Sequence, residues 1–236
     1  MTIEAIAHRG YSTKYPENTL SAYQASIDLG FSHIEIDVHL SKDGIPVIMH
    51  DKTVDRTTDG SGLIIDHTLN ELQSLKMKGG ERMPTLDETL ELAKDQCKVA
   101  IELKQSNDMY EGLEKKVYEL IVEKEMIDAV YVNSFNHEAI RRMRSIAPEL
   151  ELGIIKAKAT PDLFPLMKEI GASSLAMELP YYSDTFADKC KNEGIQLIVW
   201  PVDTIEACTM MIKRQNVLCT VNELEQFKAY YYEKED

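Results

Sequence analysis

The feature that most constrains this chain is a regular alternation of short β-branched segments with longer amphipathic segments. Eight of the short segments are predicted to be strands, because they are brief, apolar and rich in Val and Ile. They span residues 3–7, 33–39, 99–103, 130–132, 150–155, 174–177, 196–200 and 217–221. Eight strands that each precede a helical segment favour an α/β fold closed as a (β/α)8 TIM barrel.

An open, doubly wound sheet is the competing α/β architecture. A dinucleotide-binding sheet of that kind carries a glycine-rich G-x-G-x-x-G turn after its first strand. Here the corresponding turn reads His8-Arg9-Gly10, without that pattern. A length of 236 residues suits one barrel, since such barrels typically hold about 250 residues. We therefore expect residues 1–236 to form a single catalytic domain.

One interval, at about residues 40–84, interrupts the alternation. It contains turn-forming pairs such as Asp43-Gly44, short strand-like pieces at 45–49 and 63–65, and a short helical segment from Leu69. The helix that belongs to the second strand then begins near Leu86. This pattern predicts a small insertion after the second strand, at the carboxyl end of the barrel where active sites form.

Helix starts are marked by capping boxes, in which Ser, Thr, Asp or Asn precedes an acidic residue by three positions. The chain offers four such pairs, namely Thr68 with Glu71, Thr85 with Glu88, Asp203 with Glu206 and Asn222 with Glu225. Each pair predicts the first turn of a helix.

Charge and hydropathy exclude several partners. Lys and Arg number 26 against 40 Asp and Glu, which gives a net charge of −14. Such a chain repels nucleic acid, so an anionic substrate would need local positive charge. No apolar stretch of about 18 residues and no signal-peptide pattern occurs. We therefore expect no membrane span and a cytoplasmic location; the oligomeric state is left open.

Acidic side chains share one face of the second strand. Side chains alternate along a strand, so Glu35 and Asp37 lie opposite the apolar residues and point into the barrel. On the third strand the same alternation leaves Glu102 and Lys104 facing inward. Three carboxylates without a nearby cysteine suit one hard divalent cation, Mg²⁺ or Ca²⁺. A buried salt-bridge network around Lys104 is the alternative interpretation.

Two histidines complete the candidate site. His8 and Arg9 end the first strand, and His50 lies in the insertion above the same rim. Each histidine alone is more often structural than catalytic, but the nearby acids favour a functional role. Arg9 and Lys104 could bind a phosphate, Arg by paired hydrogen bonds and Lys as a point charge.

These residues belong to a series of motifs that resembles the glycerophosphodiester phosphodiesterase family. The motifs occur in order, over about the first 105 residues: His8-Arg9-Gly10, Pro16-Glu17-Asn18-Thr19, Ile34-Glu35-Ile36-Asp37-Val38, Lys42-Asp43-Gly44, His50-Asp51, Arg56-Thr57-Thr58 and Glu102-Leu103-Lys104. The complete set is highly specific, whereas His-Arg-Gly alone is not.

The resemblance implies a TIM-barrel enzyme that hydrolyses glycerophosphodiesters to glycerol 3-phosphate and an alcohol with a divalent metal. It implies three sets of site residues: the metal ligands Glu35, Asp37 and Glu102, the acid–base pair His8 and His50, and the substrate contacts Arg9, Lys104 and Trp200. It further implies attack by the glycerol 2-hydroxyl and a cyclic phosphate intermediate.

The eighth strand departs from the family pattern. Members often end it with Thr-Asp-x-Pro, whereas this chain reads Thr220-Val221-Asn222. Two other functions stay open: a related barrel that cleaves lysophospholipids in the manner of a phospholipase D, and a barrel that only binds a phosphorylated metabolite. The acidic chain without a basic amphipathic segment argues against the first. All seven catalytic, metal and phosphate positions are present, which argues against the second.

Overall fold

The computed structural model describes residues 2–214 and 216–233, and in it eight parallel strands close into a barrel. The strand order is β1-β9-β8-β7-β6-β5-β4-β2, and β1 pairs with β2 to complete the ring. The barrel strands are β1 (Ile3–His8), β2 (Phe31–Leu40), β4 (Lys98–Leu103), β5 (Val130–Ser134), β6 (Glu151–Ile155), β7 (Ser174–Glu178), β8 (Gln196–Trp200) and β9 (Val217–Val221). The predicted TIM barrel and its eight strands are confirmed.

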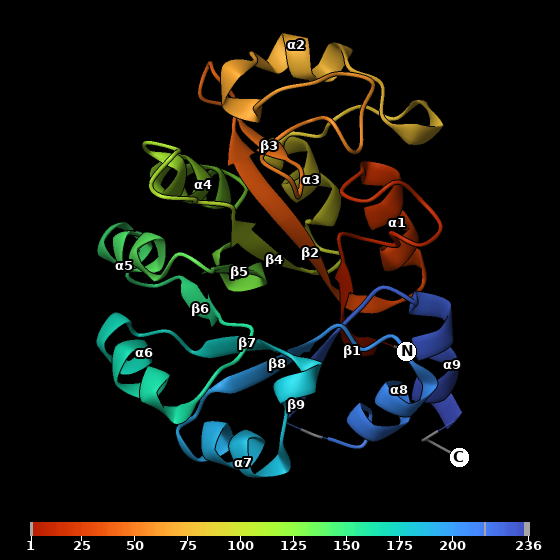
Figure 1. Cartoon of the computed structure of the whole chain (residues 1–236), viewed down its shortest axis with the longest axis vertical. Coiled ribbons are helices and arrows are strands. Elements are labelled where there is room, and N and C mark those ends of the chain that lie inside the picture. The colour runs from red at the N-terminus through yellow and green to blue at the C-terminus, as the bar shows by residue number, and fades with distance from the viewer. Residues whose placement is uncertain (1, 215, 234–236) are drawn as a thin grey trace.

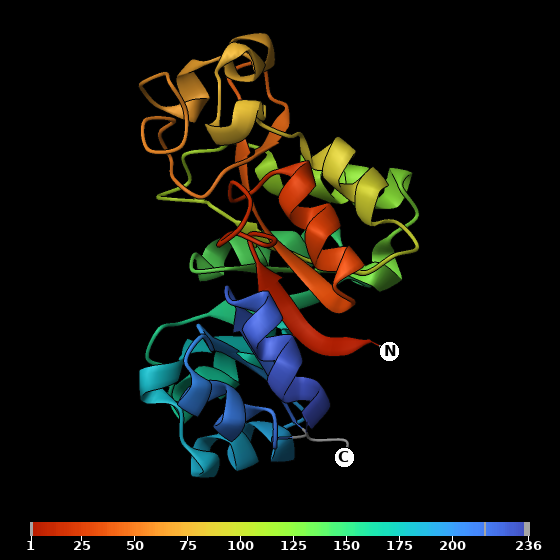
Figure 2. The same ribbon diagram turned by 90° about the vertical axis from the view of Figure 1, so that its right-hand side faces the viewer.

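Helices surround the ring of strands (Figures 1 and 2). They are α1 (Leu20–Asp28), α3 (Leu86–Ala93), α4 (Leu113–Glu123), α5 (His137–Ile146), α6 (Phe164–Ile170), α7 (Asp184–Asn192), α8 (Ile205–Met211) and α9 (Leu224–Glu233). Three short 3₁₀ turns accompany them, η3 (Ile127–Ala129), η4 (Pro161–Leu163) and η5 (Leu179–Tyr181). The main core lies between helices and strands, where β2 contributes Ile34, Ile36 and Val38 from one face.

The insertion follows β2 and extends beyond the ring of strands (top of Figure 1). It contains β3 (Pro46–Ile48), η1 (Ile64–Asp66), α2 (Leu69–Ser74) and η2 (Lys78–Gly80). β3 pairs antiparallel with the end of β2, and a small apolar cluster that includes Val54 and Leu72 fills the insertion. The prediction of a strand-like segment at 63–65 was wrong, because Leu63 is followed by the 3₁₀ turn η1.

Two of the four predicted capping boxes are present. Thr68 and Thr85 accept from the backbone N–H of Glu71 and Glu88 respectively, and those glutamates bond back to the caps. The prediction for Asp203 was wrong, because Thr204 caps α8. The Asn222 side chain bonds instead to neighbouring side chains of the barrel rim, described below. Among the described residues, no helix combines the length and apolar character needed to cross a membrane.

Candidate active site

The acidic cluster forms where β2 and β4 run side by side. Asp37 and Glu102 are register partners across these strands, and Glu35 lies two residues before Asp37 on the same face. One carboxylate oxygen from each of the three residues lies within 4.8 Å of the others. The alternation of side chains along parallel strands thus brings together the three acids that were expected to bind a metal.

Cations and an amide surround this cluster. Lys104 Nζ lies 2.7 Å from Glu102 Oε1 and 3.2 Å from Asp37 Oδ1. Arg9 Nε lies 3.6 Å from Asp37 Oδ2, and the Arg9 backbone N–H donates to Glu35 Oε2 at 3.0 Å. Asn18 Nδ2 donates to the same Asp37 oxygen at 2.9 Å. Both positive side chains expected at the phosphate therefore lie beside the acids.

The pKa values of the three acids diverge strongly. Burial, together with the charge of Asp37, raises the pKa of Glu35 well above its usual range. Burial likewise raises the pKa of Glu102 to about 7, although Lys104 opposes this shift. For Asp37, burial is outweighed by Lys104 and Arg9, which lower its pKa to about 2. Three carboxylates, two of them buried and one partly buried, cannot all ionise in such proximity unless more positive charge is added.

The cluster therefore fits a divalent cation. Its donor atoms are carboxylate oxygens, which Mg²⁺ and Ca²⁺ prefer. Asp37 Oδ1 is buried and accepts no hydrogen bond of suitable geometry from the described residues, although the ammonium group of Lys104 lies 3.2 Å away. Lys104 does form the ion pairs of the alternative interpretation, but Lys104 and Arg9 together bring two positive charges to three carboxylates.

His8 ends β1 and is oriented by residues from the other end of the chain. Its Nδ1 lies 2.9 Å from Asn222 Oδ1. Asn222 in turn donates to Asp203 through its backbone N–H at 2.7 Å and through Nδ2 at 2.6 Å. Because carboxylate oxygens only accept, Asn222 presents Oδ1 to His8, and Nδ1 of His8 carries the proton. The other ring nitrogen, Nε2, can therefore take part in proton transfer. Burial and the positive charge of Arg9 lower the pKa of His8.

His50 follows β3 and is oriented by a chain of ion pairs. Its Nδ1 lies 2.8 Å from Asp51 Oδ1, and Arg56 Nε lies 2.6 Å from Asp51 Oδ2. Arg56 then binds both oxygens of Glu17, at 2.7 and 2.8 Å. Glu17 reaches Arg9 at 3.2 Å. The insertion and the loop after β1 thus hold the second histidine jointly.

The two histidines of β2, His33 and His39, do not line the cavity of the candidate site. His39 Nε2 contacts the carbonyl oxygen of His50 at 3.3 Å, and its Nδ1 contacts the Tyr110 hydroxyl at 2.7 Å. A carbonyl only accepts, so His39 donates from Nε2 and accepts at Nδ1. Burial lowers its pKa to about 4, which keeps it neutral. His33 lines a separate hollow with Glu4 and Lys98, at the amino end of the strands.

The mouth of the barrel contains a cavity of about 140 Å³. It is lined by Ile6, His8, Arg9, Glu35, His50, Glu102, Tyr131, Asn133, Phe135, Ile155, Ala176, Ile198, Trp200 and Thr220. Both histidines, two of the acids, Arg9 and Trp200 therefore surround one space. Trp200 packs edge-on against Phe135, with 6.2 Å between ring centroids.

Several residues of the site were missed from the sequence. Asn133 is one of them: its Oδ1, like Nε1 of the expected residue Trp200, is a buried polar atom without a hydrogen-bond partner among the described residues, and both residues line the cavity. They are available to substrate hydroxyl groups. A polar residue at the carboxyl end of a barrel strand indicates a functional position, and Asn133 and Asn222 both lie at such an end. Asp203 was masked by its resemblance to a helix cap.

Comparison with known proteins agrees with this arrangement. The model of the glycerophosphoryl diester phosphodiesterase family matches residues 8–222. A glycerophosphodiester phosphodiesterase from Caldanaerobacter subterraneus subsp. tengcongensis is 38% identical, covering 88% of this chain and 89% of the relative. A solved Oleispira antarctica phosphodiesterase in complex with the product sn-glycerol-3-phosphate superposes with a TM-score of 0.90 at 26% identity, covering 97% and 96% of the two chains.

A second solved structure, the glycerophosphodiester phosphodiesterase of Agrobacterium tumefaciens, gives a TM-score of 0.84 at 26% identity and covers 97% of this chain and 100% of that one. The match to the family model runs from the last residue of β1, through the insertion, to the residue after β9. It includes both histidines and all three acids. The chain therefore belongs to the glycerophosphoryl diester phosphodiesterase family and is a phosphoric diester hydrolase.

Proposed function

We propose that this protein hydrolyses glycerophosphodiesters to glycerol 3-phosphate and an alcohol, with one divalent cation, Mg²⁺ or Ca²⁺, as cofactor. The observation that carries this proposal is the cavity at the barrel mouth, where two histidines and two of the three clustered acids line one space with Arg9. The Oleispira relative, whose structure contains sn-glycerol-3-phosphate, supports the same substrate class.

Glu35, Asp37 and Glu102 are the proposed metal ligands. The close approach of their carboxylate oxygens, within 4.8 Å of one another, and the raised pKa values of the two glutamates support this assignment, because added positive charge would stabilise the ionised acids. When bound, the cation would offset negative charge on the phosphoryl oxygens.

Arg9 and Lys104 are the proposed phosphate contacts. Arg9 Nε is buried and lies 3.6 Å from Asp37 Oδ2, but it donates no hydrogen bond to any residue that the structure describes, so it could donate one to a phosphate oxygen. Trp200 would bind the glycerol portion, through its ring and its unpaired Nε1.

His8 and His50 are the proposed acid and base. In the first step, the oxygen of the glycerol 2-hydroxyl attacks phosphorus, His50 takes its proton, and His8 protonates the oxygen of the departing alcohol. Asp51, 2.8 Å from His50, stabilises the imidazolium that forms. Water then opens the cyclic phosphate while the two histidines exchange roles. Holding the hydroxyl in line contributes about 7 to 11 kcal/mol, more than one proton transfer supplies.

The whole chain is proposed to act as one catalytic domain. The insertion supports this, because it supplies His50 to a cavity whose other walls come from the barrel strands. A cytoplasmic location and the absence of a nucleic-acid partner stay predictions from the sequence.

Release of glycerol 3-phosphate from several glycerophosphodiesters tests the function. We expect a chelator to abolish turnover and Mg²⁺ or Ca²⁺ to restore it. His8→Ala and His50→Ala should each abolish turnover as well. A 2-deoxyglycerol analogue should be inert, because it lacks the attacking hydroxyl. Undiminished activity in both histidine variants would refute the acid–base assignment, and normal turnover of the analogue would refute the cyclic intermediate.

A further inference from the structure

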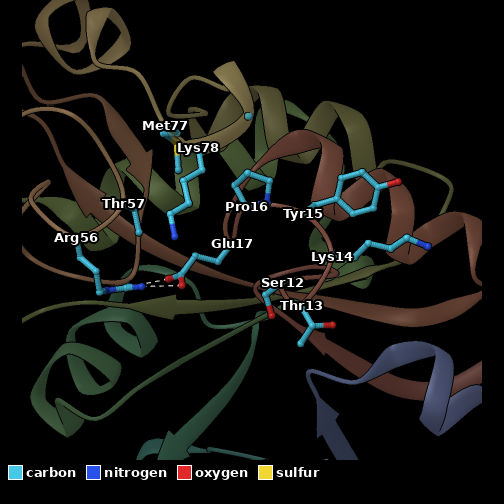
Figure 3. A pocket seen from close by; sticks show the side chains of 11 residues that line it. Ser12, Thr13, Lys14, Tyr15, Pro16, Glu17, Arg56, Thr57, Met77 and Lys78 are labelled. Atoms are coloured by element: carbon cyan, nitrogen blue, oxygen red, sulfur yellow. Dashed lines mark hydrogen bonds and ion pairs between the residues drawn. The ribbon is translucent and has the colours of Figure 1, made fainter.

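A second and larger hollow lies beside the catalytic cavity, between the loop after β1 and the insertion (Figure 3). This cleft has a volume of about 650 Å³. It is lined by Ser12, Thr13, Lys14, Tyr15, Pro16, Glu17, Arg56, Thr57, Met77, Lys78 and Gly79. Both borders follow the carboxyl ends of barrel strands, on the face of the barrel that carries the catalytic residues.

The volumes of the two hollows indicate how a diester divides between them. Pockets for small molecules generally measure about 300 to 1,000 Å³. The catalytic cavity, at about 140 Å³, falls below that range, whereas the cleft, at about 650 Å³, falls within it. The catalytic cavity can therefore enclose only part of a diester, and the rest must extend out of it.

Short chains of contacting side chains join the wall of the cleft to the wall of the catalytic cavity. Glu17 lines the cleft and contacts Arg9, which lines the cavity. Arg56 also lines the cleft, and it reaches His50 through Asp51. Ser12 also lines the cleft, and its hydroxyl donates to the backbone carbonyl oxygen of His8 at 3.1 Å. His8 is the residue proposed to protonate the departing alcohol, so an alcohol that extends past His8 on this side would reach the cleft.

The charge of the cleft is opposite to that of the whole protein. Its lining carries three cations, Lys14, Arg56 and Lys78, against the single acid Glu17, whereas the chain as a whole has a net charge of −14. A quaternary ammonium group would need a cage of aromatic rings, but the lining offers only Tyr15. The cleft therefore suits an anionic ligand better than a cationic one.

Lys78 is the cation available to such a ligand. Lys14 is paired with Glu225 at 3.1 Å, and Arg56 is paired with Glu17 and Asp51. Lys78 has no hydrogen bond or ion pair with any residue that the structure describes. Figure 3 shows its side chain extending from the insertion toward the Arg56–Glu17 pair, while Lys14 extends in a different direction.

We propose that this cleft binds the leaving alcohol of the substrate and that Lys78 gives it a preference for alcohols that carry an anionic group, such as a second phosphate. The proposal rests on the proposed function, because it assigns a place to one product of that reaction. The metal, the histidines and the phosphate contacts act on the scissile diester, whereas Lys78 acts only on the alcohol.

Two substrates that differ by one phosphate test the preference. Glycerophosphoinositol and glycerophosphoinositol 4-phosphate present the same glycerol and the same scissile bond. We expect a higher kcat/KM for the second substrate. Lys78→Gln should lower that value about two- to fivefold, as for loss of an exposed ion pair, and should leave the first substrate unaffected. Raising the ionic strength should reduce the difference in the wild-type protein.

A matched control and a binding measurement complete the experiment. Lys76→Gln removes an exposed lysine two residues away that does not line the cleft, and it should change neither substrate. Inositol 4-phosphate should inhibit the wild-type protein more strongly than Lys78→Gln, whereas inhibition by glycerol 3-phosphate should be the same in both.

The outcomes separate this proposal from the proposed function. Turnover of neither substrate with any cation would refute the proposed function. Turnover of both with equal kcat/KM, or a preference that survives Lys78→Gln, would refute the cleft proposal alone. A preference that instead disappears in Phe135→Ala would also refute it, because Phe135 lines the catalytic cavity and not the cleft.

Discussion

Arg56 and Glu17 form a two-point ion pair, at 2.7 and 2.8 Å, that joins the insertion to the loop after β1. Each partner forms a second ion pair toward the catalytic cavity. Arg56 binds Asp51, which contacts His50, and Glu17 binds Arg9, which lines the cavity. The pair therefore fixes the position of His50 relative to the barrel, although neither residue lines the catalytic cavity.

Glu17→Gln should lower kcat more than it raises KM. Glutamine keeps the size of the side chain but loses the charge that binds two arginines, so Asp51 and His50 are held less firmly. We expect a loss in kcat of about tenfold, which is less than the 10² to 10⁴ that a general acid or base contributes, because His50 itself is retained. Steady-state kinetics with glycerophosphocholine would measure it.

Arg82→Gln is the matched control for this prediction. Arg82 pairs with Glu88, another contact of the insertion, but it lies outside the catalytic cavity. The Arg82→Gln variant should leave kcat unchanged. An equal loss in both variants would indicate that the insertion had merely loosened, and the positioning role of Glu17 would be wrong.

Asp203→Asn should impair His8 without removing any group that touches substrate. The Asp203 carboxylate fixes the orientation of the Asn222 amide, which in turn fixes the proton on His8 Nδ1. An amide at position 203 can donate as well as accept, so this orientation is no longer imposed. We expect a loss in kcat of at least about tenfold.

The tautomer of His8 can be observed directly. In ¹⁵N spectra recorded at high pH, wild-type His8 should carry its proton on Nδ1, and Asp203→Asn should show a mixture of tautomers. Asp188→Asn, at an exposed aspartate that does not line the catalytic cavity, should alter neither the spectrum nor kcat. An unchanged His8 spectrum in Asp203→Asn would contradict the relay.

Cation binding should stabilise the protein and release protons. At a concentration of 100 times Kd, a ligand adds about 2.7 kcal/mol to the free energy of unfolding, which raises Tm by about 5 to 10 °C in a chain of this size. Because the pKa of Glu102 is about 7 and that of Glu35 is also raised, protons compete with the cation. Affinity for Mg²⁺ or Ca²⁺ should therefore fall as the pH drops below 7.

Glu35→Gln supplies the variant for this measurement. It removes one ligand charge, while its side-chain oxygen can still accept from the Arg9 backbone N–H. The shift in Tm should be lost, whereas Glu206→Gln, at an exposed glutamate, should retain it in full. A shift that persists in Glu35→Gln would exclude this residue as a ligand.

How far the sequence predicts this site depends on the distance over which each contact acts. Glu35, Asp37 and Glu102 could be placed together because strand alternation and parallel pairing are strict geometric rules. The contact between His8 and Asn222 joins residues 214 positions apart, and no local pattern encodes it. Locally, Asn222 fits a helix cap equally well.

The insertion shows the same limit at the level of secondary structure. Its capping box at Thr68 was predictable, because the two hydrogen bonds form within four residues. The apolar segment at 63–65 is too short for its periodicity to distinguish a strand from a 3₁₀ turn. Packing of Ile64 into the small cluster of the insertion accompanies the turn that is observed.

His33 should make the protein less stable in acid. Its side chain is 8% exposed, and burial, with a contribution from Lys98, lowers its pKa from 6.5 to about 4. The unfolded chain therefore binds a proton at higher pH than the folded one. The stabilisation is complete above pH 6.5 and is lost as the pH falls toward 4, by about 3 kcal/mol.

Urea unfolding of the wild-type protein and of His33→Gln, both with chelator, would measure this contribution. The glutamine does not titrate, so the difference in free energy of unfolding between the two proteins should shrink by about 3 kcal/mol between pH 7 and pH 4. Other groups, including the acids of the proposed metal site, titrate in both proteins and cancel in that difference. Parallel pH profiles would show that His33 is protonated at the same pH in the folded and unfolded chains, contrary to its burial.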